Sequence, residues 1–159
     1  MKSGRLAIVV VSLLTAGAST AAPATASGPA ALALAGVVAL YSPLLTADER
    51  EAVSAFFVGQ SGVRYAKKIS VTADKIVCRT SNVDITARSC EVTFKIKKQT
   101  LTGREASELF ATEVMAGIPA EGAAGSNFES LSKLNCTLDP ALLKQKAGAG
   151  AECSYEAVN

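Results

Sequence analysis

The sequence predicts a small α+β domain with one antiparallel sheet, helices packed on one face of that sheet, and two disulfides. Three observations lead to this prediction. Short segments such as SCEVTFKIK (residues 89–97) alternate polar and apolar residues, other segments begin with helix-capping sequences, and the four cysteines keep the phase of the apolar strand positions. Alternation with a period of two is typical of a half-buried strand, and such strands combined with helices on one face form an α+β fold.

Residues 1–26 are predicted to be a signal peptide. Two basic residues precede the apolar run 6–14, and a stretch of small residues then allows cleavage after Ala18 or Ala26. A charged start, a short apolar middle and a small-residue exit are typical of secretory signals. We therefore expect a single domain over residues 27–159, located in the periplasm or the extracellular space.

A second apolar segment, residues 31–45, follows soon afterwards. A transmembrane helix needs about 20 apolar residues, and this segment is shorter and is interrupted by Ser42 and Pro43. We expect a buried helix of the domain. Association with a membrane surface is the alternative, although the segment lacks the basic polar face typical of interfacial helices.

The next segments predict a helix followed by strands. Thr46 and Glu49 have the spacing of a capping box, so a helix is expected from about residue 47 to residue 58. Residues 63–80 are expected to form a strand with a turn or bulge near Ala73 and Asp74, because the apolar phase changes there. The strand that carries Cys90 follows, and residues 97–103 are expected to lead out of the sheet.

The second half predicts more helix. A helix is expected over residues 102–119, starting with Thr102 and Glu105 as a capping box, and a short helix is expected to start at Ser126 with Glu129 as its partner. A strand around Cys136, a short helix that begins at Asp139-Pro140, and a last strand around Cys153 complete the prediction.

The cysteines predict disulfides. In an exported protein of this size, an even number of cysteines indicates bridges. Zinc sites use closely spaced ligand pairs, usually with histidine, and this chain has no histidine and no close cysteine pair, so no metal is expected. Of the three pairings allowed, we prefer Cys78 with Cys90 and Cys136 with Cys153. The first pairing places Ile76 opposite Val92, with a turn around residues 81–84.

The net charge gives no support for nucleic-acid binding. Lys2 and Arg5 belong to the predicted signal peptide, and 14 of the 16 basic residues then remain beside 14 acidic residues. The charges are unevenly placed, since residues 63–104 contain ten basic and three acidic side chains. A basic surface for an anionic partner is one interpretation, and two halves of complementary charge within one fold is the preferred one.

Catalysis is not the favoured function class. Without histidine, Ser-His-Asp and Cys-His catalysis cannot be built from this chain. A carboxylate-dependent hydrolase of envelope material is the catalytic alternative, with Glu105, Glu108 and Glu121 as candidates. No catalytic residue and no cofactor are assigned.

The preferred hypothesis is an exported, non-catalytic binding protein whose partner is an unknown protein or a small anionic ligand. The first candidate surface is the basic group Lys95, Lys97 and Lys98. The second is a glycine-rich segment that could form an anion-binding nest before the predicted helix, made of Gly122, Gly125 and Ser126. An envelope protein bound to the membrane surface is a further alternative.

Overall fold

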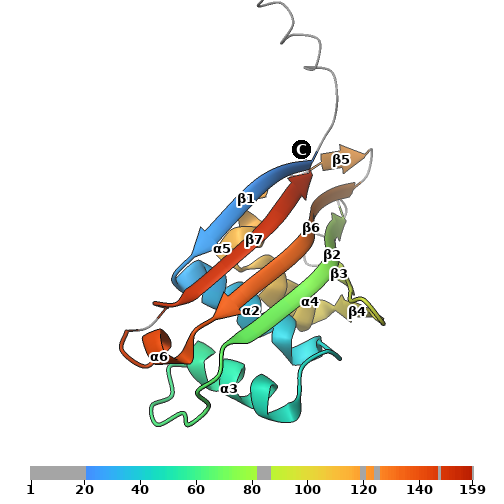
Figure 1. Ribbon diagram of the computed structural model, residues 1–159. Coiled ribbons are helices and arrows are strands. Elements are labelled where there is room, and N and C mark those ends of the chain that lie inside the picture. Colours follow the sequence, from blue (N-terminus) through green and yellow to red (C-terminus); the bar gives the residue numbers. More distant parts are fainter. Residues whose placement is uncertain (1–20, 82–86, 119–120, 124–125, 147, 159) are drawn as a thin grey trace, which may run out of the picture.

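The computed structural model describes residues 21–81, 87–118, 121–123, 126–146 and 148–158 (Figure 1). Within these residues, seven strands form one antiparallel sheet: β1 (Ala21–Ser27), β2 (Ile69–Ser81), β3 (Arg88–Thr93), β4 (Lys98–Thr102), β5 (Glu121–Ala123), β6 (Ser126–Leu138) and β7 (Ala151–Val158). Six of them lie in the order β1-β7-β6-β2-β3-β4, and β5 pairs with β6.

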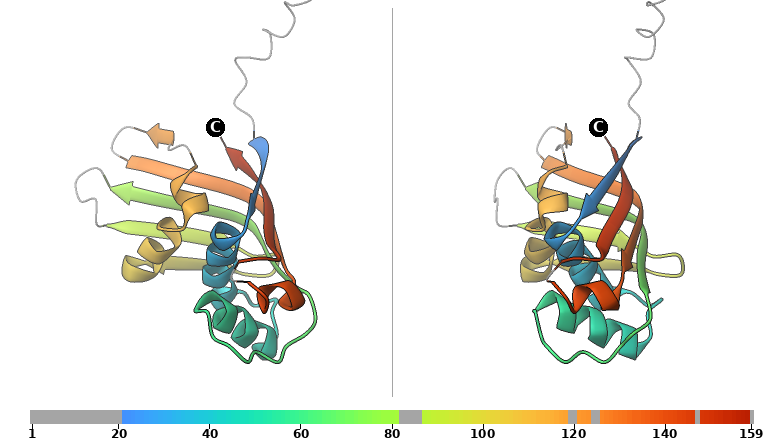
Figure 2. Two further views of the ribbon diagram at one scale, coloured as in Figure 1. Left: turned by 90° about the vertical axis from the view of Figure 1, so that its left-hand side faces the viewer. Right: turned by 60° about the vertical axis from the view of Figure 1, so that its left-hand side comes forward.

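Five helices accompany the sheet in the described residues: α2 (Pro29–Tyr41), α3 (Ala47–Phe57), α4 (Gly103–Phe110), α5 (Glu113–Ala116) and α6 (Pro140–Leu143). The sheet curves around α2, and α4 and α5 lie on the same side (Figure 2). We call this covered side the inner face. The opposite, outer face is polar and includes exposed side chains such as Thr25, Ser70 and Thr137. This arrangement confirms the predicted α+β class.

Helix α2 is the centre of the core. Its side chains from Ala31 to Ala39 are buried except for Ala33, which is half-buried, because the sheet and the other helices surround it. A helix that is apolar all round must be buried in this way, so the prediction of a buried helix in this segment is confirmed. No helix among the described residues has the length and apolar character that crossing a membrane requires.

Both predicted disulfides are present. Cys78 lies directly opposite Cys90 on β2 and β3, and Cys136 lies opposite Cys153 on β6 and β7. Ile76 lies opposite Val92, as expected. The turn was predicted at residues 81–84. Ser81 is the last residue of β2, and residues 82–84 lie outside the described residues.

The predicted irregularity near Ala73 and Asp74 is also confirmed. Ala73 and Ile76 are both buried although they have opposite parity, so β2 changes phase between them. Its neighbour β6 shows the matching change, because Lys133 has φ 53° and the pairing with β7 shifts between Ser132 and Asn135. The change allows one continuous 13-residue strand to keep apolar side chains inward along its whole length.

At the two sheet edges, one prediction was wrong and one strand was not predicted. Residues 98–102 do not leave the sheet but form edge strand β4, in which Leu101 is fully buried opposite Cys90. β1 was not expected at all, and it occupies the opposite edge, paired with β7. Both strands are short or poor in large apolar residues, so their sequences carry little alternation.

Two helix predictions in the second half were also wrong. The expected helix over 102–119 is interrupted after Phe110, because the Thr112 hydroxyl donates to the Leu109 carbonyl and accepts from Met115 N–H, which starts α5. The Thr102 side chain makes no cap hydrogen bond, and Gly103 has φ 59°. The helix expected at Ser126 is strand β6 instead, since the start of β6 pairs with β2 and β5 and this pairing prevails over the local capping pattern.

Candidate functional site

The basic residues Lys95, Lys97 and Lys98 lie at the exposed turn between β3 and β4. Phe94 N–H donates to the Lys97 carbonyl at 2.7 Å, and Lys97 N–H donates back to the Phe94 carbonyl at 3.3 Å, which leaves Lys95 and Ile96 at the tip. Ile96 is 70% exposed there. This exposed turn offers positive charge but does not enclose a ligand.

The glycine-rich candidate lies in a hairpin rather than before a helix. Gly122 belongs to β5 and pairs with Asn127, and Ser126 is the first residue of β6. Gly125 lies outside the described residues. The helix terminus that would have supported an anion nest is replaced here by strand β6.

The candidate carboxylates lie on two different elements, α4 and β5. Glu105 and Glu108 are exposed on α4, and Glu108 Oε1 accepts from Arg104 Nε at 3.1 Å. Their negative charges lie near Tyr41, whose pKa is raised by burial and then by these two carboxylates. Glu121 is the first residue of β5.

A crevice of about 760 Å³ lies between α3 and the segment that follows it, and we call it the α3 crevice. Residues 58–68 contain no helix or strand and pass back along α3, and Gly59 and Gly62 adopt positive φ where the chain reverses (Figure 2). The buried side of α3, with Val53 and Phe56, packs toward the core. The opposite side is therefore left facing this segment across a gap.

The local sequence explains why α3 is rigid enough to form one wall. The Thr46 hydroxyl accepts from Glu49 N–H at 3.1 Å, and the Glu49 carboxylate accepts from Thr46 N–H at 2.9 Å. This reciprocal capping box, predicted from the sequence, satisfies two terminal amide groups. It places Asp48 and Arg50, in the first turn, at the mouth of the crevice.

Arg50 provides an unpartnered hydrogen-bond donor. Its Nη2 donates to the Leu45 carbonyl at 3.0 Å, whereas its Nε is buried and has no hydrogen-bond partner. A guanidinium stays charged at all relevant pH values, and an unsatisfied buried N–H costs about 1–3 kcal/mol. Arg50 also lines the crevice, so its positive charge is placed to attract an anion there.

The rest of the lining is amphipathic. Leu40 and Val58 line the crevice and are 46% and 71% exposed, so a ligand could cover apolar surface there. Arg64 and Tyr65 supply polar groups from the facing segment, and Glu51 lies on the α3 side. A volume in the range of about 300–1,000 Å³ and a mixture of apolar wall with few polar groups are typical of small-molecule sites.

Sequence reasoning missed this crevice. Arg50 lies one helical turn before the fully buried Val53, a spacing that places its aliphatic stem at the edge of the apolar side of α3. This spacing was the feature of the sequence that could have pointed to Arg50. Residues 63–68 of the facing segment were predicted to begin the strand, but β2 begins only at Ile69, and the position of this segment along α3 is a tertiary contact.

A second polar group lies on the inner face next to the Cys78–Cys90 disulfide. The Arg88 guanidinium carbon is 4.2 Å from the centre of the Phe110 ring, and both Arg88 Nε and Glu129 Oε2 are buried without a hydrogen-bond partner. Burial raises the pKa of Glu129, and the positive charge of Arg88 partly offsets that rise. Glu129 could have been identified from its parity with Leu131, had the segment been interpreted as a strand.

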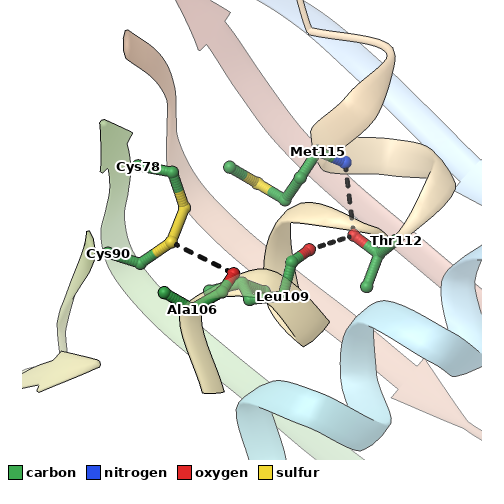
Figure 3. The surroundings of a disulfide bond; sticks show 6 residues. All are labelled: Cys78, Cys90, Ala106, Leu109, Thr112 and Met115. Carbon is green, nitrogen blue, oxygen red and sulfur yellow. Dashed lines mark hydrogen bonds between the residues drawn. A yellow bond between two sulfur atoms is a disulfide. The ribbon is translucent and has the colours of Figure 1, made fainter. Parts of the chain in front are cut away.

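The disulfide itself is packed rather than reactive. Figure 3 shows the bridge facing α4 and α5, with Cys90 Sγ 3.8 Å from the Ala106 carbonyl oxygen and with Leu109 and Met115 beside it. Both sulfurs are buried. Exposed, electropositive surroundings are what reactive cysteines need, so this bridge serves to hold β2 and β3 together.

Within the described residues, no group of three or more His, Cys, Asp or Glu side chains is placed to hold a metal ion. No protein-family model matches the chain, and no curated protein and no solved structure matches it either. The two disulfides and the geometry of the α3 crevice are therefore the observations on which an assignment must rest.

Proposed function

We propose that this chain is an exported binding protein that holds a small amphipathic anion in the α3 crevice. The observation that carries the proposal is Arg50, a cationic side chain that lines the crevice and whose Nη2 is held by the Leu45 carbonyl. A carboxylate bound there would form a charge-assisted hydrogen bond, which is stronger than a neutral one. The apolar part of the ligand would lie against Leu40 and Val58.

Two cross-strand disulfides support the exported location. Disulfides persist in oxidising compartments and are rare in the cytosol, and all four cysteines of this chain are paired. The basic turn at Lys95, Lys97 and Lys98 stays a candidate for steering an anion toward the protein, because exposed charges raise association rates more than affinity.

The test uses sodium decanoate as the probe and decan-1-ol as its neutral match, with binding measured by calorimetry on the oxidised protein. We expect decanoate to bind and Arg50→Gln to weaken binding about 10- to 100-fold, because a hydrogen bond to a charged group contributes about 1.5–3 kcal/mol. The matched control is Arg104→Gln, which removes the same charge from an exposed position on α4.

Equal affinity for decanoate in the Arg50→Gln variant and the parent would contradict the proposal. Thermal unfolding of both arginine variants checks that a loss of binding is not a loss of fold. Arg50→Lys keeps the charge but not the planar guanidinium, so it separates directed hydrogen bonding from simple attraction.

Association with a membrane surface is a second candidate, favoured by one observation. Four of the six exposed large apolar side chains in the described part of the chain fall within residues 40–58: Leu40, Leu44, Phe57 and Val58. Flotation with vesicles of phosphatidylglycerol and phosphatidylcholine tests it. Co-flotation that is lost on Val58→Ser would favour this candidate over capture of a free anion.

A further inference from the structure

We propose that the precursor is cleaved after Ala18 rather than after Ala26, so that β1 stays in the mature protein as an edge strand. This inference rests on the predicted signal peptide and is independent of the α3 crevice. Both bonds follow the small-x-small pattern recognised by signal peptidases, Ala16-Gly17-Ala18 and Ala24-Thr25-Ala26. The sequence alone does not choose between them, but only the product of cleavage after Ala18 keeps the whole of β1 in the sheet.

β1 pairs with β7 along its whole length. All seven residues of the strand have a partner, from Ala21 opposite Val158 to Ser27 opposite Glu152. The pairing continues past the strand, since Gly28 N–H donates to the Ala151 carbonyl at 3.0 Å. Cleavage after Ala26 would leave only Ser27 of this strand.

The inner side of β1 also contributes to the core. Ala24 lies opposite Tyr155, and Ala26 lies opposite Cys153 and packs against the buried cluster. Ala22, Ala24 and Ala26 are half-buried, while Pro23 and Thr25 alternate with them toward solvent. This alternation is that of an integral strand and not of a segment about to be removed.

Loss of β1 would expose β7 as a new edge next to the Cys136–Cys153 disulfide. β7 is eight residues long, and an open strand of that length is a template for pairing with other chains. As an edge strand, β1 is less prone to pair with other chains, because Pro23 interrupts its row of free N–H groups. Cleavage after Ala18 gives the product that keeps this protection.

The experiment expresses the full precursor in a Gram-negative host and measures the intact mass of the protein recovered from the periplasm. The two products differ by eight residues, so the mass separates them. We expect a mature N-terminus at Ser19. An N-terminus at Ser27, or an uncleaved precursor, would overturn the inference.

Two matched substitutions at the residue before each bond make the test sharper, because a large side chain there blocks signal peptidases. Ala18→Leu should abolish or shift processing, whereas Ala26→Leu should leave the cleavage at Ser19 unchanged. Processing precedes folding, so denatured samples suffice and a misfolded variant still gives a result. Blocked processing in Ala26→Leu with normal processing in Ala18→Leu would overturn the inference.

Discussion

Glu129 illustrates how the sheet controls a single ionisable group. β6 places it opposite Cys78 on the inner face, where it is 9% exposed and its Oε2 has no hydrogen-bond partner. Burial disfavours the charged form, so the pKa of Glu129 is raised, and the nearby Arg88 only partly counteracts this. The folded state therefore binds a proton more readily at this carboxyl than the unfolded state does.

The raised pKa of Glu129 determines how the stability of the fold changes with pH. A folded pKa above the unfolded value of about 4.5 gives a contribution to stability that is present below that pH and is lost as the pH rises through the folded pKa. We predict that Glu129→Gln unfolds with a larger free energy than the parent at pH 7, and that the difference shrinks at pH 4. Urea unfolding at both pH values measures it.

Glu91→Gln, at an exposed position on β3, is the control for the Glu129 experiment and should show no such pH-dependent gain. A Glu129→Gln variant that is less stable than the parent at pH 7 would show that attraction to Arg88 outweighs the cost of burial.

At the scale of elements, α2 and α3 meet through a close approach that depends on one glycine. A Cβ atom at Gly36 would lie 2.7 Å from Phe57 Cγ. Phe57 is 42% exposed, yet its ring covers α2 at this point. The position of α3, and with it one wall of the α3 crevice, therefore depends on Gly36 having no side chain.

Gly36→Ala is predicted to destabilise the protein by about 1–3 kcal/mol, because the ring of Phe57 must move away from α2. In a Phe57→Ala background, the same substitution should be neutral or stabilise by up to about 1 kcal/mol, since alanine favours helix over glycine. Urea unfolding of the four proteins in this cycle gives both values. Equal effects in the two backgrounds would show that the contact is not what restricts residue 36.

Elements with strong local signals were predictable. The capping box at Thr46, the Asp139-Pro140 helix start and the alternation around Cys90 all lie where local chemistry and tertiary packing agree. The segment from Ser126 was wrongly predicted to be a helix because Ser126 and Glu129 have the spacing of a capping box. In the structure the same residues form the start of β6, where hydrogen bonding to β2 and β5 prevails over that local pattern. Edge strands β1 and β4 lacked a signal because an edge needs few large apolar residues.

The candidate site was less predictable than the fold. The sequence drew attention to exposed lysines, whereas the crevice depends on Arg50 and on how residues 58–68, which form no helix or strand, lie along α3. Charge is visible in a sequence, but concavity is created by tertiary contacts. The disulfide pairing was predictable because the register of neighbouring strands restricts it.

For the whole molecule, the two disulfides fasten neighbouring strands and do not join the helices to the sheet. One links β2 to β3 across 12 residues of sequence, and the other links β6 to β7 across 17. The chain-entropy model gives each loop a contribution of about 3 kcal/mol. A domain of this size has a free energy of unfolding of about 5–15 kcal/mol, so each bridge contributes a large part of that free energy.

We predict that Cys78→Ala/Cys90→Ala and Cys136→Ala/Cys153→Ala each lower the free energy of unfolding by about 3 kcal/mol, with similar effects because the loops are similar in length. Guanidinium unfolding of the oxidised proteins measures the loss. An unchanged free energy in either double variant would show that its bridge does not restrict the unfolded chain.

The pairing of β1 with β7 has a mechanical consequence. Ala21 lies opposite Val158, so the two ends of the described domain lie side by side at one edge of the sheet (Figure 1). A force that pulled these ends apart would load the hydrogen bonds between β1 and β7 one after another, as in a zipper, rather than all at once in shear. β1 would peel off at low force, and further unzipping of β7 from β6 would stop at the covalent Cys136–Cys153 link.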